Sequence, residues 1–176
     1  MKRIAIDMDE VIADALSAML GAYNREFAEA LTIQDLQGRG LPEAVHPDRR
    51  SKIEDYCRAE DFFRHLEVIP DSREVIAELN VRHEVFITTA AMEYPSSFTS
   101  KYAWLQEHFP FIPASRIVFC GSKSIIRADY LIDDNVRHFQ SFVGQGILFT
   151  APHNIHETGY PRVHSWWGVA ALFSEL

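Results

Sequence analysis

The stretch IAIDMDEVIAD, residues 4–14, begins as a short apolar strand and ends by placing Asp7 and Asp9 one residue apart. Two carboxylates this close repel each other, so solvent, a cation or a chemical task must stabilise them. The apolar part is typical of a buried strand, and the acidic turn ends it. The stretch therefore predicts a strand whose carboxyl end carries a charged site.

The composition is that of an acidic globular chain with one domain, or one domain with a modest insertion. The chain has 176 residues, a hydrophobic fraction of 47% and a formal net charge of −8. The acidic balance argues against binding to a nucleic-acid polymer or to a membrane surface, and no stretch reaches the roughly 20 apolar residues of a membrane span. Cys57 and Cys120 stand in no metal-ligand spacing and are expected to be free, buried thiols. Because the N-terminus has no signal-peptide pattern, we expect a cytoplasmic protein.

Apolar runs alternate with helical patterns along most of the chain. The expected strands are residues 2–7, 84–89, 116–120, 130–133 and 146–150. Helical patterns are expected at residues 14–29, 47–63, 71–79, around 102–109, at 135–142 and at 166–173. Strands that alternate with helices predict an α/β fold, with a parallel sheet and helices on both faces. The Gly-, Pro- and charge-containing block from Leu31 to Ile69 breaks this alternation and indicates an insertion.

Three of the expected helices carry recognisable start signals. Asp71 followed by Glu74 resembles a capping box, Pro47 suits the first turn of a helix, and Ser165 could cap the last helix.

Polar residues follow the expected strands at four places. In a parallel sheet, ligands bind beyond the carboxyl ends of the strands, so these residues should share one site. They are Asp7 and Asp9, Thr88 or Thr89, Lys123, and Asp133 with Asp134. Each of them taken singly could be a turn residue or a helix cap. Four strand ends of the same character favour a functional site.

Other motifs do not indicate a function on their own. CGSKS, residues 120–124, lacks the adjacent Gly-Lys of a phosphate loop, and GQG at 144–146 comes before a strand, so neither predicts a nucleotide-binding loop. His153 and His156 form an H-x-x-H pair without an evident third ligand, which does not make a metal site. The Trp pair at 166–167 is expected to pack in the core or a lid.

The strand-end residues suit phosphoryl chemistry. Carboxylates without His or Cys select a hard cation such as Mg²⁺, which shares its coordination with a substrate phosphate. Mg²⁺ between Asp7, Asp9 and the pair Asp133–Asp134 would offset their repulsion, and Thr89 and Lys123 could bind the other phosphate oxygens. With no Ser–His pair in view, Asp7 is the expected nucleophile. Asp9 would protonate the leaving oxygen and then activate water.

Four segments in this order, DMDEVIAD, TTAAM, SK and LIDD, resemble the motifs of the haloacid dehalogenase (HAD) superfamily of phosphohydrolases. The fit is closer still to the 5′(3′)-deoxyribonucleotidase family, which has an Asp-x-Asp-x-Val start, a short cap insertion and a Lys ten residues before an Ile-Asp-Asp ending. Lys123 and Asp133 have that spacing, and EDFFRHLEVIPDS resembles the family's cap exit. The matching motifs extend over residues 7–134.

The resemblance implies a Rossmann-like three-layer core made of residues 1–14 and 71–176. Residues 15–70 would form a small, mostly helical cap. It also implies Asp7 as the nucleophile and Asp9 as the acid/base of an Mg²⁺-dependent phosphomonoesterase with an aspartyl-phosphate intermediate.

Further roles follow from the resemblance. Thr89 and Lys123 would bind phosphate, and Asp134 would be the direct metal ligand of its pair, supported by Asp133 and joined by the backbone carbonyl of Asp9. In the cap, Phe62 and Phe63 could form an aromatic wall for a base, or could equally be the cap's own packing.

Two residues depart from the pattern of the deoxyribonucleotidases. Glu10 stands where these proteins usually have Gly, and Ala90 follows Thr89 where they often have Ser. Both departures bear on substrate specificity and leave the phosphoryl chemistry unchanged.

The expected substrates are deoxyribonucleoside 5′- or 3′-monophosphates, with a sugar phosphate or another small metabolite as the alternative. A receiver-like signalling module also uses Asp, Thr and Lys at strand ends, but it carries its phosphorylated Asp in mid-chain and needs no insertion. A catalytically silent relative is a third reading. The expected partner is a small phosphate ester, and the oligomeric state is left open.

Overall fold

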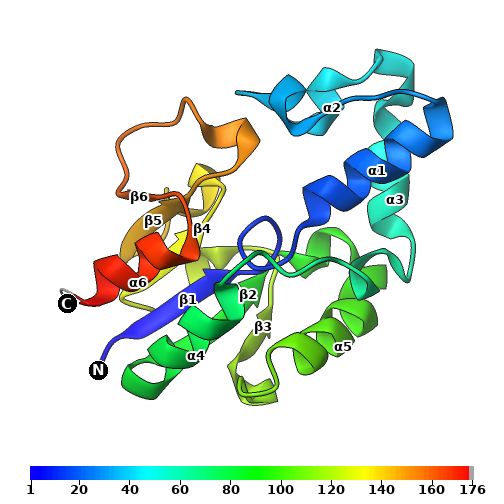
Figure 1. Ribbon diagram of the computed structural model, residues 1–176. Helices are drawn as coiled ribbons and strands as arrows, with labels where there is room; N and C mark the ends of the chain where they lie inside the picture. Colours follow the sequence, from blue (N-terminus) through cyan, green and yellow to red (C-terminus); the bar gives the residue numbers. More distant parts are fainter. Residues whose placement is uncertain (175–176) are drawn as a thin grey trace.

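The computed structural model describes residues 1–174, which form a six-stranded sheet with helices around it (Figure 1). All neighbouring strands pair in parallel, in the order β3-β2-β1-β4-β5-β6. The strands are β1 (Arg3–Asp7), β2 (Glu84–Thr89), β3 (Ile117–Phe119), β4 (Tyr130–Asp133), β5 (Gln145–Phe149) and β6 (Arg162–Val163). The predicted α/β parallel sheet is confirmed. β6 was not predicted, because two residues are too few for a strand pattern.

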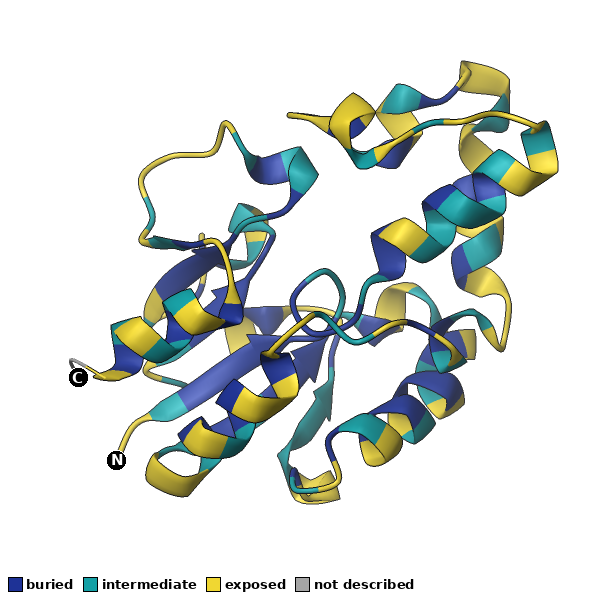
Figure 2. Cartoon of the chain, in the orientation of Figure 1, coloured by how far each residue is buried: buried dark blue, intermediate teal, exposed yellow. Residues whose placement is uncertain are grey.

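The larger core lies between one face of the sheet and three helices, and it is the deeply buried centre of Figure 2. The helices of this layer are α4 (Ser72–Arg82), α5 (Phe98–His108) and α6 (Trp166–Ser174). Side chains alternate between the two faces of a strand, so Ile4 and Ile6 of β1 face this layer with Val85 and Ile87 of β2. Their burial contributes apolar surface that holds the helices to the sheet.

The opposite face of the sheet is covered by loops and 3₁₀ turns, so the expectation of α-helices on both faces is wrong for the residues that the structure describes. Ala5 and Leu131 of this face pack against Phe139 and Phe142. The predicted helix at 135–142 is wrong, because only the 3₁₀ turn Val136–His138 forms within it. Phe139 and Phe142 both follow this 3₁₀ turn, and consecutive turns bring both rings onto the sheet.

Two of the three predicted helix starts need correction or refinement. Asp71 occupies the N-cap position of α4, as predicted, but it forms no capping box: its backbone is left-handed (φ 64°) and its side chain makes no cap hydrogen bond. Pro47 opens the 3₁₀ turn Pro47–Arg49, after which α3 runs only from Arg50 to Arg58. Ser165 is confirmed, since its Oγ accepts the backbone N–H of Gly168 at 3.2 Å.

A block made of α1 (Ala15–Phe27), α2 (Leu41–Ala44) and α3 lies beyond the carboxyl ends of the strands (Figure 1). It has a hydrophobic cluster of its own, which includes Leu20, Tyr23, Leu36 and Ile53. The chain passes between sheet and block through two adjacent segments. Ala13 and Val68 form an antiparallel bridge there. The cap boundaries at residues 15 and 70 stay a prediction.

The loop that follows β1 is tightly held. The backbone N–H groups of Ile12 and Ala13 both donate to the carbonyl of Met8, at 2.9 Å each. Trp166, fully buried, donates its indole N–H to the carbonyl of Val11 at 2.8 Å. The last helix therefore fixes the loop that carries the acidic turn.

Two further expectations concern the whole chain. Cys57 and Cys120 are both free and buried, as predicted. Within residues 1–174, no helix combines the length and the apolar character that crossing a membrane requires.

Replacing Trp166 with Phe keeps most of the ring packing but leaves the carbonyl of Val11 without its donor. We expect Trp166→Phe to lower the free energy of unfolding by about 1–3 kcal/mol, because a buried polar group loses its partner. Urea denaturation measures this change. Trp167→Phe is the matched control, because Trp167 is exposed, and should change stability by less than about 0.5 kcal/mol. Equal losses in the two variants would contradict the role given to Trp166.

Candidate active site

Three carboxylates meet where β1 and β4 end. Asp7 is the last residue of β1, Asp133 is the last residue of β4, and Asp134 follows it. The two strands are neighbours, and each of the three residues offers an oxygen within 4.8 Å of the others. All three are buried. Adjacent parallel strands thus bring together groups that are more than 120 residues apart in the sequence.

A buried ammonium group separates two of these carboxylates. Lys123, in the 3₁₀ turn Lys123–Ile125, places its Nζ 2.5 Å from Oδ1 of Asp7 and 2.6 Å from Oδ2 of Asp133. Asp7 and Asp133 lie on the same face of the sheet as Ala5 and Leu131, which is the face that the Lys123 turn covers.

The charges of this cluster perturb one another. Burial raises the pKa of Asp7 to about 6, against the opposing effect of Lys123. Burial also lowers the pKa of Lys123, but the charges of Asp7 and Asp133 outweigh it and the pKa lies above its ordinary value. The pKa of Asp134 is raised by burial and by the two neighbouring carboxylates. One ammonium group does not compensate three carboxylates, which leaves the cluster short of positive charge.

Asp134 has polar neighbours that the sequence did not predict. Its backbone carbonyl accepts a hydrogen bond from Nδ2 of Asn154 at 2.7 Å. Nε2 of His153 lies 3.2 Å from the same carbonyl and 3.5 Å from Oδ2 of Asp134. His156 is exposed and lies beside Gly38, so the two histidines of the H-x-x-H pair do not face a common point.

Asp9 pairs with a lysine that the sequence reasoning missed. Lys101 of α5 is buried, contacts Oδ2 of Asp9, and donates to Oγ1 of Thr89 at 3.0 Å. The sequence carries one signal for it, because Lys101 falls three and four positions before Trp104 and Leu105, on the buried stripe of the helix. Thr89, rather than Thr88, therefore belongs to this part of the site. The hydroxyl of Thr88 instead donates to the carbonyl of Ile6, at 3.3 Å.

The two Phe residues proposed as a wall have different surroundings. Phe63 is buried, lines the pocket and lies under the ammonium of Lys101, whose Nζ is 4.2 Å from the ring centroid. Phe62 packs edge-on against Phe63, and the described lining of the pocket does not include it. Their contact with a base stays a prediction.

These groups lie at one end of a pocket of about 390 Å³. Asp7, Asp9, Lys101, Lys123 and Asp134 form its polar end. The other end is lined by residues of the 15–70 block that are mostly apolar: Leu16, Met19, Leu41, Pro42, Ile53 and Cys57. Charge at one end and apolar surface at the other suit a ligand with an anionic group and a flat or apolar body.

Glu10 and Ala90, the two residues that depart from the pattern of the deoxyribonucleotidases, both line this pocket. Glu10 has a left-handed backbone (φ 61°), a conformation that Gly adopts at the lowest cost. Its carboxylate accepts the N–H of Leu16 at 2.6 Å, which links the acidic turn to the start of α1. Ala90 presents only a methyl group next to Thr89.

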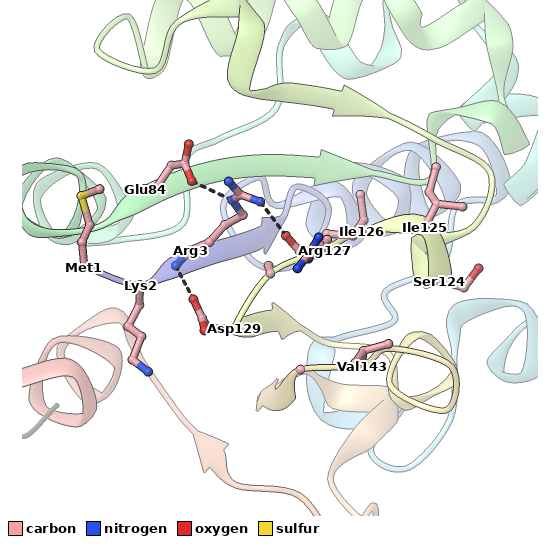
Figure 3. Close-up of a pocket in the computed structure, with 12 residues that line it drawn as sticks. Met1, Lys2, Arg3, Glu84, Ser124, Ile125, Ile126, Arg127, Asp129 and Val143 are labelled. Carbon is pink, nitrogen blue, oxygen red and sulfur yellow. Dashed lines mark hydrogen bonds and ion pairs between the residues drawn. The ribbon is translucent and has the colours of Figure 1, made fainter.

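A second hollow lies at the opposite edge of the sheet, where the strands begin (Figure 3). It is larger, at about 730 Å³. In this hollow Arg3 bonds to Glu84 at 2.7 Å, and Asp129 accepts the backbone N–H of Arg3 at 2.7 Å. It lacks the carboxylate cluster, so the smaller pocket is the candidate active site.

The donor set at the candidate site fits a hard divalent cation. Asp7, Asp133 and Asp134 supply only oxygen ligands at mutual distances that one ion can span. A second positive charge would also reduce the repulsion that raises the pKa of Asp134.

Comparison with known proteins identifies the family to which this chain belongs. Residues 1–175 match the family described as 5′ nucleotidase, deoxy (pyrimidine), cytosolic type C protein. The chain belongs to this nucleotidase family. The resemblance stated from the four motifs is thereby confirmed, together with the prediction of a hydrolase that acts on phosphoric monoesters.

Relatives of the nucleotidase match it over nearly their whole length. A relative from Staphylococcus aureus (strain Mu50) is 45% identical over 172 residues, which is 98% of this chain and 95% of its own. The 5′(3′)-deoxyribonucleotidase of Bacillus subtilis (strain 168) is 41% identical over 166 residues, 94% of each chain.

Solved structures confirm the fold. A haloacid dehalogenase-like hydrolase of Streptococcus pneumoniae has a TM-score of 0.66 and 13% identity, with 98% of both chains covered. A HAD hydrolase of Bacillus subtilis, described as bound to magnesium, has a TM-score of 0.61 and 14% identity over 98% of both chains. The nucleotidase therefore has the Rossmann-like α/β fold of the HAD superfamily.

Glu10→Gln keeps an acceptor for the N–H of Leu16 and removes a carboxyl whose pKa is raised by burial and by Asp14. Because the folded pKa exceeds the unfolded one, this carboxyl destabilises the folded state progressively as pH rises from the unfolded through the folded pKa. We expect the metal-free variant to melt above the wild type at about pH 8 and to match it near pH 4.

Thermal melts in EDTA at the two pH values measure this effect. The control is Glu78→Gln, which removes an exposed carboxyl of α4 and should melt with the wild type at both. A wild type that is as stable as Glu10→Gln at about pH 8 would refute the assignment.

Proposed function

We propose that the nucleotidase is an Mg²⁺-dependent phosphomonoesterase that dephosphorylates deoxyribonucleoside 5′- or 3′-monophosphates through an aspartyl-phosphate on Asp7. The main support is the cluster of Asp7, Asp133 and Asp134 around Lys123, at the polar end of a pocket whose other end is apolar. Such a pocket suits a phosphate at one end and a nucleoside at the other.

In the first half-reaction, a carboxylate oxygen of Asp7 attacks phosphorus, and the bond from phosphorus to the ester oxygen breaks. Asp9 donates a proton to that departing oxygen, which leaves as an alcohol. Lys123 has three N–H donors, of which two are used by Asp7 and Asp133. The third is available for a phosphate oxygen, so the ammonium reduces repulsion between nucleophile and substrate.

In the second half-reaction, water attacks the phosphorus of the aspartyl-phosphate. Asp9, now a carboxylate, takes a proton from this water, and the bond between phosphorus and Asp7 breaks. The products are inorganic phosphate and the regenerated carboxylate of Asp7. Thr89 would support phosphate binding through the hydroxyl that Lys101 contacts.

Mg²⁺ would be held by Asp7, by Asp134 and by the backbone carbonyl of Asp9. Asp133, whose oxygens already accept from Lys123 and from the N–H of Asn135 at 2.9 Å, would support these ligands. When bound, the ion supplies charge neutralisation at the transferring phosphoryl group.

The proposed substrate class draws on the pocket and on the relatives. The Bacillus subtilis relative is a 5′(3′)-deoxyribonucleotidase, and the apolar end formed by Leu16, Met19 and Ile53 suits a base better than a bare sugar. Phe63 adds a ring to this lining. A sugar phosphate or another small phosphate ester is the alternative partner.

We also propose that residues 15–70 act as a cap on a core of residues 1–14 and 71–176. The adjacent crossings at Ala13 and Val68 support this division, and so does the separate hydrophobic cluster of the block. The cap would supply the apolar end of the pocket, while the core supplies the reacting groups.

Asp7→Asn should abolish phosphate release, with a loss of at least about 1,000-fold in kcat, because the amide is not a nucleophile at phosphorus. The measurement is phosphate release from a panel of deoxyribonucleotides, ribonucleotides and sugar phosphates with Mg²⁺. Asp48→Asn, which removes an exposed carboxylate, is the control with unchanged turnover. Near-normal turnover by Asp7→Asn would remove Asp7 as nucleophile. Efficient turnover of a sugar phosphate, with deoxyribonucleotides at background, would defeat the substrate assignment alone.

Chelation of Mg²⁺ should abolish turnover, and added Mg²⁺ should raise the melting temperature by a few degrees at about pH 7.5. Mg²⁺ competes with protons on these carboxylates, so this gain should shrink below the pKa of Asp7, at about 6. Asp134→Asn should reduce the gain, whereas Asp48→Asn should retain it. Full activity in EDTA would contradict the metal requirement.

A further inference from the structure

Lys101 is a buried cation whose ammonium group has three contacts within the protein. Its side chain is 2% exposed. The ammonium contacts Oδ2 of Asp9, donates to Oγ1 of Thr89 at 3.0 Å and lies 4.2 Å from the ring centroid of Phe63. A buried charge is costly unless it is paired in this way. The three directions of the ammonium are thus used by the protein itself.

The two carboxylate oxygens of Asp9 differ in their hydrogen-bond partners. Oδ2 is held by Lys101, whereas Oδ1 is buried and has no hydrogen-bond partner within residues 1–174. A buried polar atom without a partner is uncommon and calls for an explanation. The Asp9 side chain as a whole is 33% exposed and lines the pocket, so its carboxyl group can meet a bound ligand.

We propose that Lys101 is a positioning residue for Asp9, which holds the Asp9 carboxyl group in the orientation in which it exchanges protons with the substrate. This inference rests on the acid/base role proposed for Asp9. The proton passes from the Asp9 carboxyl group to the ester oxygen as the bond from that oxygen to phosphorus breaks. Asp9 is then a carboxylate beside the ammonium of Lys101, and it recovers a proton from the attacking water.

The two buried lysines of the site differ in what their ammonium groups contact. Lys123 keeps one N–H donor that is free for phosphate after its bonds to Asp7 and Asp133. Lys101 has its ammonium directed to Asp9, Thr89 and Phe63 instead. Lys101 therefore acts through Asp9, and its removal should affect proton transfer more than phosphate binding.

Leaving-group dependence tests this role. The sugar oxygen of a deoxyribonucleoside monophosphate is strongly basic and needs a proton to leave, whereas the oxygen of p-nitrophenyl phosphate is weakly basic and leaves without one. The ratio of kcat/KM for the two substrates reports on the acid, because kcat/KM covers the steps up to release of the leaving group. The ratio does not depend on how much of a preparation is folded.

Lys101→Met should lower kcat/KM for the deoxyribonucleotide by about 30-fold or more and that for p-nitrophenyl phosphate by less than about threefold. Adding Lys101→Met to Asp9→Asn should cause no further loss on the deoxyribonucleotide, because the two residues act as a unit. The matched control is Lys52→Met, which removes a half-exposed ammonium that pairs with Glu26 at 3.5 Å and should leave both substrates unchanged.

Equal losses of Lys101→Met on the two substrates would overturn the inference, since a purely structural lysine lowers both alike. Asp9→Asn separates this failure from failure of the proposed function. If Asp9→Asn discriminates between the substrates and Lys101→Met does not, only the positioning role is wrong. If Asp9→Asn does not discriminate, the acid role of Asp9 is wrong and the inference falls with it.

Discussion

The ion cluster of Asp7, Asp133, Asp134 and Lys123 is the constraint on which the rest of the site depends. Its three carboxylates have oxygens within 4.8 Å of one another, and the one buried ammonium among them, that of Lys123, pairs with Asp7 and Asp133. At this separation each pair of like charges costs about 3.5 kcal/mol for an effective dielectric constant of about 20. Burial raises the pKa values of Asp7 and Asp134 most, and this repulsion raises them further. Only a further cation lets all three ionise together, and their oxygen-only character decides which kind of cation fits.

The side chains of the site lie on both faces of the sheet. Asp7 and Asp133 face the turn of Lys123, together with Ala5 and Leu131. Thr89 has the parity of Val85 and Ile87, which face the helices, and it meets Lys101 of α5 there. Each carboxylate of the Asp-x-Asp pair therefore has a lysine of its own, and the two lysines come from opposite layers. In the proposed mechanism, this division lets one carboxylate meet phosphorus while the other is held apart for proton transfer.

The strand-end rule predicted much of this site because it depends on topology alone. Parallel strands end at a common edge, so residues after four strands had to converge whatever their spacing in sequence. Lys101 escaped that rule because it lies on a helix, and its burial depends on Asp9, which is 92 residues away. The prediction of a helix at residues 135–142 was wrong for a similar reason. Its apolar residues suit a helix, but their packing on the sheet decides that only a 3₁₀ turn forms.

The acidic turn carries two tasks with the same few residues. Between Asp7 and Asp14 it holds the two carboxylates that we propose to react, and at Ala13 it forms the bridge to Val68, next to which the 15–70 block joins the sheet. Glu10 ties the turn to α1 through the N–H of Leu16, and Trp166 ties it to the last helix. The position of the apolar end of the pocket and the position of Asp9 are thus set by one network of hydrogen bonds. A residue at position 10 with a left-handed backbone is costly for any side chain but Gly. Oε1 of Glu10 accepts the N–H of Leu16 in the first turn of α1, a contact that Gly could not make and that a protonated carboxyl group retains.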